Sequence, residues 1–340
     1  MKFLVIRLGG ISDILLTTPV IRCLSKQLPG SELHYLVATQ HKHVIEHNPF
    51  ISRIHVAGNN DQKLFDELKE ESFEQVIDLQ HDAFSARLKK HLKLPYHSFP
   101  KRSFQAAVFT RLKWNIMPAN EHQVDRFMET VDSFGVKNDG AGLDYFIPSS
   151  ERITQRDIPA SHQLGYIAIV ISASKFTRRM TQLKIRELCM AIDHPLILVG
   201  QEKDAELADA IASFDPVKVY NACGKFSFNE TADLIDRSKL VIAPDTGFMQ
   251  LAAALKKPLI VVWGSTTPSL GKTPYYGINH FQKNKTPSEH VQVHKLWCRP
   301  CTTEGRSSCP QGHFKCMKKI SIEEITTLVK RKLSAKKEQG

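Results

Sequence analysis

Short apolar runs and segments with the 3.6-residue period of amphipathic helices follow one another along the chain. In the first half, the runs "FLVI", "ELHYLVA", "RIHVA" and "EQVIDL" are separated by helical or polar segments. Their apolar residues do not alternate strictly with polar ones, which is typical of parallel strands covered on both faces. The pattern predicts an α/β protein with a doubly wound parallel sheet.

The alternation stops in a polar, proline-containing stretch, "IPSSERITQRDIPASHQLG", and then restarts with "YIAIVIS", "PLILVG", "KLVIAP" and "PLIVVWGS". We therefore expect two Rossmann-like domains at 1–150 and 166–320, a linker at 151–165, and a C-terminal helix and basic tail at 321–340. Two such domains facing each other would enclose a central cleft at the carboxyl ends of their strands, where open α/β sheets bind ligands.

The chain begins with a strand, a loop with Gly9 and Gly10, and a helix that starts near Asp13. Pro19 is expected to kink this helix, and "LPG" is expected to end it. A junction of this kind usually binds phosphate, yet here it carries a carboxylate. Asp13 is either a helix cap or a group that faces a ligand, and the segment alone favours the cap.

The second half repeats this geometry in "VIAPDTGFMQLAAAL". Asp245, Thr246 and Gly247 form the loop before a helix, where backbone N–H groups and a hydroxyl suit a diphosphate. A simple helix cap is an equal alternative for this motif alone.

A second anion site is expected after "YIAIVIS", in the loop "ASKFTRRM". It gathers Ser174, Lys175, Thr177, Arg178 and Arg179, and a cluster of cations favours a bound phosphate over an empty exposed loop. If this domain holds the diphosphate, Asp13 is free to accept a proton from an attacking hydroxyl.

The net charge of the chain indicates which classes of partner it binds. Lys and Arg number 46 against 35 Asp and Glu, a formal net charge of +11, which favours anionic partners. The sequences "RLKKHLK" and "KRSFQAAVFTRLK" place Lys89, Lys90, Lys101, Arg102, Arg111 and Lys113 among apolar residues. The N-terminus has no apolar run long enough for a signal peptide or a membrane span, so a cytoplasmic location is expected.

Four cysteines lie close together near the end of the second domain: Cys298, Cys301, Cys309 and Cys316. With His313 nearby, they are a candidate zinc site. The wide second spacing favours reduced cysteines in a surface loop instead, and no metal is expected in the site.

The segments "VIRLGGISDILLTTPVIRCL", "ASKFTRRM", "VYNACGKFSFNETADLI" and "VIAPDTGFMQLAAAL…PLIVVWGSTTP" resemble the family 9 glycosyltransferases, the heptosyltransferases of lipopolysaccharide core synthesis. The resemblance runs from residue 1 to about 320. It implies a GT-B fold and transfer of heptose from ADP-heptose, with inversion and without a metal or other cofactor. The implied acceptor is a lipid-linked saccharide carrying Kdo or heptose at the cytoplasmic face of the inner membrane, where the enzyme would be peripheral.

The resemblance also implies roles for individual residues. Asp13 corresponds to the general base beside the acceptor loop of Gly9 and Gly10, while Ser174, Thr177, Arg178, Asp245, Thr246, Gly247 and Gln250 correspond to donor-binding positions. Two of these depart from the family pattern, because Arg178 stands where a Lys is common and Gln250 where a His is common. Arg178 keeps the positive charge that pairs with the phosphates. Gln250 bears on which sugar the donor carries.

Two other function classes stay open at the sequence level. A nucleotide-sugar epimerase or hydrolase of the same architecture would convert the donor alone, and a transferase of the same family could use another sugar. A nucleic-acid binder would explain the charge and the cysteines, but the chain has no helix-turn-helix or aromatic platform, so no nucleic-acid partner is expected.

Overall fold

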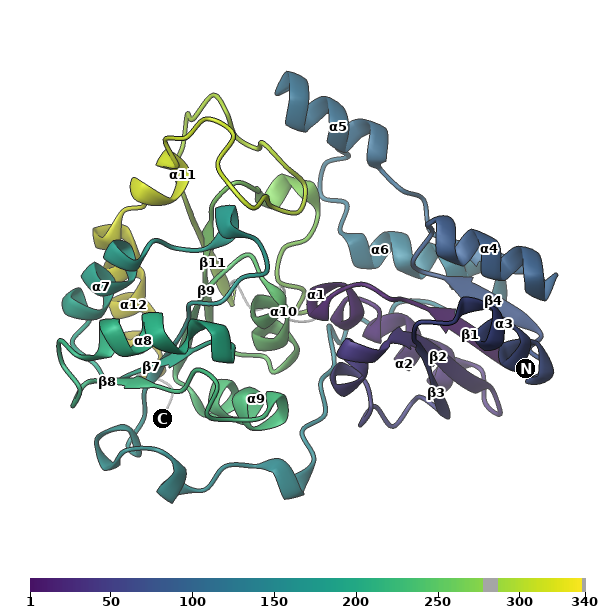
Figure 1. The fold of residues 1–340 in the computed structure, drawn as a ribbon, viewed down its shortest axis with the longest axis horizontal. Helices are drawn as coiled ribbons and strands as arrows, with labels where there is room; N and C mark the ends of the chain where they lie inside the picture. Colours follow the sequence, from purple (N-terminus) through teal and green to yellow (C-terminus); the bar gives the residue numbers. More distant parts are fainter. Residues whose placement is uncertain (278–286, 338–340) are drawn as a thin grey trace. The chain divides into compact units, whose positions relative to one another are not determined.

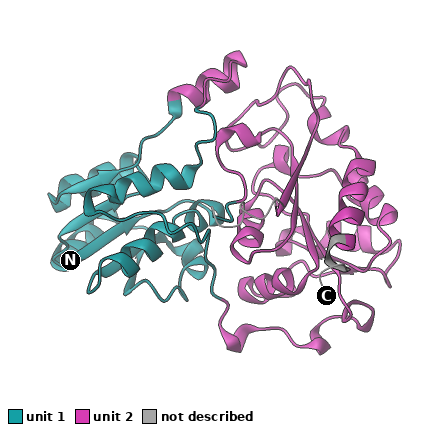
Figure 2. Cartoon of the chain, turned by 180° about the vertical axis from the view of Figure 1, so that it is seen from behind, with its two compact units in different colours: residues 1–103, 118–146, 275–279 teal, residues 104–117, 147–274, 280–340 magenta. Residues whose placement is uncertain are grey.

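The computed structural model describes residues 1–277 and 287–337, and the side chains up to residue 334. The chain divides into two compact units (Figure 2). Unit 1 comprises Met1–Ser103, Pro118–Phe146 and a short segment that begins at Tyr275. Unit 2 comprises Phe104–Met117, Ile147–Pro274 and the remaining described residues. The main boundary after Phe146 lies close to the end of the first expected domain.

Unit 1 contains one parallel sheet with the strand order β3-β2-β1-β4-β5 (Figure 1). Its strands are β1 (Lys2–Ile6), β2 (Glu32–Ala38), β3 (Arg53–Ala57), β4 (Gln75–Asp78) and β5 (Tyr96–Ser98). Its helices are α1 (Ile11–Leu15), α2 (Thr18–Gln27), α3 (Asp61–Glu70), α4 (Ala83–Leu92) and α6 (Gln123–Met128), with the short 3-10 helices η1 (Thr39–Val44) and η2 (Glu129–Phe134).

Both faces of the unit 1 sheet are covered. Leu4 and Ile6 of β1 pack in one buried cluster with Leu64, Phe65 and Leu68 of α3 and with Leu88 and Leu92 of α4. Successive strand residues point to opposite faces, so Phe3 lies on the other side, where its ring meets Phe134 edge to face at 5.3 Å. This two-sided burial explains why the strands carry apolar residues on both faces.

Unit 2 contains a second parallel sheet with the order β11-β10-β9-β6-β7-β8. Its strands are β6 (Ile167–Val170), β7 (Leu196–Val199), β8 (Val219–Asn221), β9 (Leu240–Pro244), β10 (Leu259–Trp263) and β11 (Ser288–Gln292). Its helices are α5 (Ser103–Leu112), α7 (Gln182–Ala191), α8 (Ala205–Ala212), α9 (Phe228–Arg237), α10 (Gly247–Ala254), α11 (Lys315–Lys318) and α12 (Ile322–Lys337). Counted from β6, this is the strand order of the Rossmann fold.

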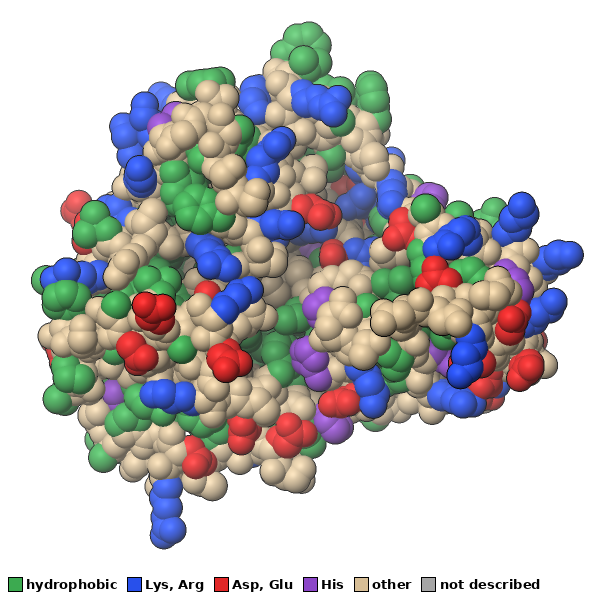
Figure 3. All heavy atoms as spheres, viewed as in Figure 1, with side chains coloured by type: hydrophobic (Ala, Val, Ile, Leu, Met, Phe, Trp, Pro, Cys, Tyr) green, Lys and Arg blue, Asp and Glu red, His purple; other side chains and the backbone are tan. Residues whose placement is uncertain are grey.

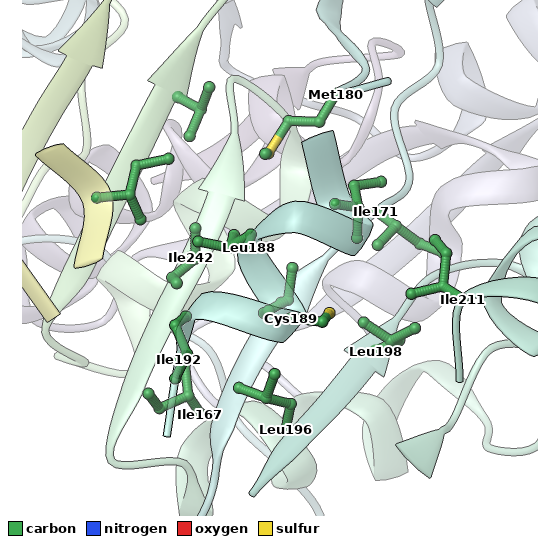
Figure 4. Close-up of a cluster of buried hydrophobic side chains, with 14 of the residues drawn as sticks. Ile167, Ile171, Met180, Leu188, Cys189, Ile192, Leu196, Leu198, Ile211 and Ile242 are labelled. Carbon is green, nitrogen blue, oxygen red and sulfur yellow. The ribbon is translucent and has the colours of Figure 1, made fainter. Parts of the chain in front are cut away.

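A buried cluster larger than the one around β1, α3 and α4 lies in unit 2 (Figure 4). Ile167 and Ile169 of β6 pack with Leu188 of α7, Ile211 of α8 and Ile325 of α12. The C-terminal helix α12 is thus part of the second domain, where the sequence suggested a separate helix and tail. Among the described residues, no helix has the length and hydropathy needed to cross a membrane.

Pro19 affects the first helix more than expected. The expected kinked helix is two helices, α1 and α2, and Pro19 occupies the first turn of α2. Proline has no N–H to donate, so the start of a helix accommodates it where an interior position does not. The expected stop at "LPG" is confirmed, because α2 ends at Gln27 and Gly30 has φ = +79°.

The polar stretch expected as a linker is attached to unit 2. Arg152 Nη1 lies 2.7 Å from Oδ1 of the buried Asp233. The ring of His162 is fully buried, with Nε2 3.0 Å from the Leu196 carbonyl oxygen. Contacts with residues far away in the chain hold the segment even though it lacks an apolar period.

Candidate active site

The topological switch point of each sheet lies between two neighbouring strands whose connections run in opposite directions, and ligands of open α/β sheets bind there. In unit 1 the switch point lies between β1 and β4, and in unit 2 it lies between β6 and β9. The loops after β1, β6 and β9 carry the acceptor-loop and donor-binding candidates, with Asp13 in the first turn of α1 and Gln250 one turn into α10.

Asp13 in unit 1 is held by an ion pair. Its Oδ1 lies 2.9 Å from Nη2 of Arg7, the residue that directly follows β1. Arg7 is buried, donates to the Leu79 carbonyl after β4, and lies over the Phe127 ring at 5.5 Å. The carboxylate therefore sits at the switch point, and about a fifth of its side chain, 22%, remains exposed.

The capping alternative for Asp13 is not what the structure contains. The N-cap of α1 is Gly10, and this helix end has no side-chain cap hydrogen bond. Asp13 lies within the first turn, where the helix dipole favours a negative charge. A carboxylate that is paired with Arg7 and partly exposed is placed to meet a ligand.

Gly9 permits this position of Asp13. A Cβ atom at residue 9 would lie 2.8 Å from Asp13 Oδ2, a separation that real side chains do not adopt. A Cβ at Gly10 would meet nothing within 4 Å. The two glycines thus differ: the first is required by the carboxylate, and the second leaves open space beside it.

His41 of η1 lies near Asp13, and His43 lies close to His41. Burial lowers the pKa of His41, and the negative charge of Asp13 acts in the opposite direction. Burial also lowers the pKa of His43. Sequence reasoning did not single out these residues, because "HKHVIEH" carries no spacing that marks a site.

In unit 2, Arg178 and Asp245 join the loops after β6 and β9. Arg178 Nη2 donates to Asp245 Oδ1 at 2.7 Å, and the other carboxylate oxygen accepts from Thr266 Oγ1 at 2.7 Å. Asp245 is 6% exposed, so this pairing fixes the guanidinium at the carboxyl end of β9. Arg178 Nη1 also donates to the Glu304 carbonyl at 3.2 Å.

Thr246 is the N-cap of α10 but does not cap it with its side chain. Its Oγ1 is buried and has no hydrogen-bond partner among the described residues. Buried hydroxyls are normally satisfied, and the helix N-terminus beside it offers N–H groups from Gly247 onward. Together with the Arg178 guanidinium, this is an arrangement that binds an anion.

Thr177 holds the loop together. It is 1% exposed, and its Oγ1 accepts from Ser265 Oγ at 2.9 Å and from the Arg306 backbone N–H at 2.8 Å. Its hydroxyl thus positions the neighbouring Arg178. Ser174 is exposed in the same loop and is open to a ligand.

Gln250 is fully buried on α10. Its Nε2 donates to the carbonyls of Lys272 and Thr273 at 3.1 and 3.0 Å. Its Oε1 is buried without a hydrogen-bond partner among the described residues. The amide therefore positions the 272–273 segment and keeps one acceptor unused.

The cysteine-rich segment packs on the Arg178 loop. Thr177 N donates to the Arg306 carbonyl at 3.1 Å, and Gly305, with φ = +91°, lies against Arg178. A Cβ at residue 305 would lie 2.8 Å from Arg178 Cδ. Ser265, Thr266 and Gly305 are site residues that sequence reasoning missed as individuals, although "GSTTP" was part of the quoted resemblance.

The candidate zinc cysteines are free thiols. Cys298 Sγ lies 3.8 Å from His313 Nε2, and burial raises the pKa of Cys316 to about 12. Within the described part of the chain, no three His, Cys, Asp or Glu side chains are arranged to hold a metal ion.

Comparison with known proteins identifies a family and relatives that the chain resembles. Residues 62–308 match the model of glycosyltransferase family 9 (heptosyltransferase). Lipopolysaccharide heptosyltransferase 1 of Campylobacter coli is 23% identical over 290 residues, which cover 78% of this chain and 84% of the relative. Lipopolysaccharide heptosyltransferase 1 of Escherichia coli K12 is 24% identical over 294 residues, covering 79% and 90%.

Solved structures agree on the fold. ADP-heptose lps heptosyltransferase II of E. coli superposes with a TM-score of 0.72 at 15% identity, over 99% of this chain and 100% of that one. The family 9 glycosyl transferase of Veillonella parvula gives 0.76 at 19% identity, over 98% and 97%. The expected GT-B fold is therefore confirmed. With a family model that matches more than half of its residues, the chain belongs to glycosyltransferase family 9, and it is a glycosyltransferase.

Proposed function

We propose that this glycosyltransferase moves a heptose from ADP-heptose to a lipopolysaccharide core acceptor that bears Kdo or heptose. Relatives over most of the chain are named lipopolysaccharide heptosyltransferases, and E. coli heptosyltransferase WaaC, of similar fold, has been solved with ADP and with ADP-2-deoxy-2-fluoro heptose. The observation that carries the proposal is the Arg178–Asp245 pair beside the unsatisfied hydroxyl of Thr246.

Unit 2 binds the diphosphate of the donor in this proposal. The Arg178 guanidinium, oriented by Asp245, and the N–H groups at the start of α10 neutralise the charge that develops on the ADP leaving group. Fixed positive charge at this position performs the task that a divalent cation performs in other transferases. Transfer is therefore proposed to proceed without a metal.

Gln250 is proposed to face the donor sugar. Its unused Oε1 can accept a hydrogen bond from a sugar hydroxyl, while its Nε2 stays bound to the 272–273 carbonyls. Ser174 adds an exposed hydroxyl in the loop after β6.

Unit 1 supplies the base. Asp13 accepts the proton of the acceptor hydroxyl as its oxygen attacks the anomeric carbon, and the bond from that carbon to the diphosphate breaks. Attack opposite to the leaving group inverts the anomeric centre. Arg7 orients the carboxylate through their ion pair, and Gly9 leaves it room.

The acceptor places the enzyme at the cytoplasmic face of the inner membrane, as a peripheral protein. The net charge of +11 favours the phosphates and carboxylates of such an acceptor and the anionic surface in which it lies.

The test is ADP release from ADP-heptose, with and without a Kdo-bearing lipid A acceptor, for the wild type and Asp13→Asn. We expect release only with acceptor, a loss of about 10²–10⁴-fold in the variant, unchanged donor binding, and full activity with a metal chelator. Asp66→Asn, an exposed carboxylate of α3, is the matched control. ADP release at the same rate without acceptor would identify a donor hydrolase. Full activity of Asp13→Asn would show that Asp13 is not the general base.

A further inference from the structure

Helix α5 and the segment after it expose large apolar side chains. Phe104 is 74% exposed, Leu112 57%, Trp114 68% and Ile116 46%. Phe104 and Leu112 are eight residues apart on the helix, with Val108 between them, and so lie on one face. Figure 3 shows hydrophobic side chains over this helix at the top of the view, with Lys and Arg beside them.

Another face of α5 and the residue after it lie beside the 292–300 segment of unit 2. Phe109 is buried, and Lys113 Nζ donates to the Pro300 carbonyl at 2.7 Å. Phe109 and Lys113 line a cavity of about 440 Å³ together with residues of the 292–300 segment. Trp297 lines the same cavity and is 68% exposed, so it continues the apolar surface of α5.

The charges on this surface have one sign. No Asp or Glu occurs between Ala83 and Asn120 or between His290 and Thr302. Arg111 and Lys295 are exposed and form no ion pair with the described residues. In contrast, Arg102 is paired with Glu121 and Lys89 with the buried Asp78, so these two cations of the basic sequence are used within unit 1.

We propose that Phe104, Leu112, Trp114 and Trp297, with Arg111 and Lys295, form a docking surface for an anionic lipid bilayer. Tryptophan prefers the interface between water and hydrocarbon, leucine and phenylalanine insert beyond it, and Lys and Arg bind the anionic headgroups. The choice of a membrane as partner rests on the proposed glycolipid acceptor. The surface would hold the enzyme where that acceptor is embedded.

Tryptophan fluorescence makes this surface directly observable. The chain has three tryptophans, and Trp263 is buried in β10 at 1% exposure, so Trp114 and Trp297 report on solvent contact. The full-length protein is mixed with vesicles of phosphatidylcholine alone, or of two parts phosphatidylcholine to one part phosphatidylglycerol. We expect emission to shift to the blue with the second vesicle only, and Trp114→Phe and Trp297→Phe each to remove part of the shift.

Flotation with the same vesicles measures partition. The double variant Phe104→Ser with Trp114→Ser is expected to bind at least about tenfold more weakly, since it removes two large apolar side chains from the bilayer. Arg111→Glu with Lys295→Glu should remove the preference for anionic vesicles. Leu164→Ser changes an apolar residue that is 93% exposed elsewhere in unit 2 and should bind as the wild type does.

The inference fails if the wild type binds neither vesicle, or if the Phe104/Trp114 variant binds as the wild type does. It also fails if these substitutions abolish self-association or retention on DNA and leave vesicle binding unchanged, because the surface would then serve a second copy or a nucleic acid. Turnover of a deacylated, water-soluble acceptor should be equal in all variants. Absence of that turnover in the wild type would overturn the proposed function. The vesicle experiments would still test the docking surface independently.

Discussion

Arg178 and Asp245 are 67 residues apart in the chain, and their side chains meet at 2.7 Å between Nη2 and Oδ1. The pair joins the loop after β6 to the loop after β9, on either side of the switch point of unit 2. Thr266, after β10, completes the arrangement by donating to the second oxygen of Asp245. Three loops thus fix one guanidinium, which is the condition for a preorganised phosphate site.

Replacement of Arg178 by Lys should weaken donor binding. Lysine keeps the charge but loses the planar fork, so it cannot reach Asp245, the Glu304 carbonyl and a phosphate together. We expect the Kd for ADP-heptose to rise about tenfold, the loss of about one charged hydrogen bond. Calorimetric titration measures this.

Arg152→Lys is the matched control for Arg178→Lys. It also breaks an Arg–Asp pair of unit 2, with Nη1 and Oδ1 2.7 Å apart, but outside the site. Donor affinity should be unchanged in this variant. An equal loss in both would mean that Arg178 acts on the stability of the fold and not on the donor.

Gly9→Ala should impair catalysis without affecting the donor. The new Cβ would lie 2.8 Å from Asp13 Oδ2, so the carboxylate has to move away from its position beside Arg7. A displacement of about 1 Å in a catalytic group costs on the order of 10²-fold in rate. Steady-state ADP release gives kcat, and the melting temperature reports on the fold.

Gly10→Ala is the control for Gly9→Ala. It tests whether the effect comes from the contact of the new Cβ with Asp13 or from replacing any glycine of this loop. Residue 10 has φ = −70° and ψ = 178°, which any residue adopts, and a Cβ there meets nothing within 4 Å. This variant should keep kcat for a small acceptor. If Gly9→Ala is as active as Gly10→Ala, the close approach of Gly9 to Asp13 has no role in catalysis.

Gly305→Ala should disturb the donor site from the cysteine-rich segment. Its φ of +91° disfavours alanine, and the Cβ would lie 2.7 Å from Lys175 Cβ and 2.8 Å from Arg178 Cδ. We expect a rise in the KM for donor of about tenfold, as Arg178 shifts from its partners. Initial rates at varied ADP-heptose measure it.

Gly312→Ala separates backbone strain from contact with Arg178. It lies in the same segment with φ = +65°, and a Cβ there meets nothing within 4 Å. The positive φ at both glycines should make Gly305→Ala and Gly312→Ala less stable than the wild type, while the KM of Gly312→Ala for donor stays at the wild-type value. Equal KM changes in both variants would show that loop strain alone is responsible.

His55 should make stability depend on pH. Burial, together with the neighbouring His34, lowers the pKa of His55 to about 4. Below the ordinary value of about 6.5 the unfolded chain binds a proton that the folded chain does not, so the free energy of unfolding falls as the pH decreases toward 4.

The comparison for His55 is with His55→Gln, which has no titrating ring. Between about pH 7.5 and about pH 5, the wild type should lose roughly 1–2 kcal/mol more than the variant. Urea unfolding at the two pH values measures this difference. Parallel losses in both proteins would assign the pH dependence to other groups.

Many elements could be predicted from the sequence because they depend on neighbours along the chain. The apolar runs marked β1, β2 and β6 to within a residue or two, since a strand buried on both faces carries apolar residues on both of them. Asp13 and the loop of Asp245 and Thr246 stood out because polar residues interrupt the strand-to-helix junctions of otherwise apolar segments.

Other features depend on residues far apart in the chain, and only the tertiary structure decided them. Thr177 accepts hydrogen bonds from Ser265 and Arg306, and Gly305 packs against Arg178. Lys113, directly after α5, donates to the Pro300 carbonyl. No periodicity encodes such contacts, because their free energy comes from side chains that meet only when the sheet has formed. The sequence by itself determined the strands, the helices and which loops carry polar groups; the folded chain determined which of those groups meet.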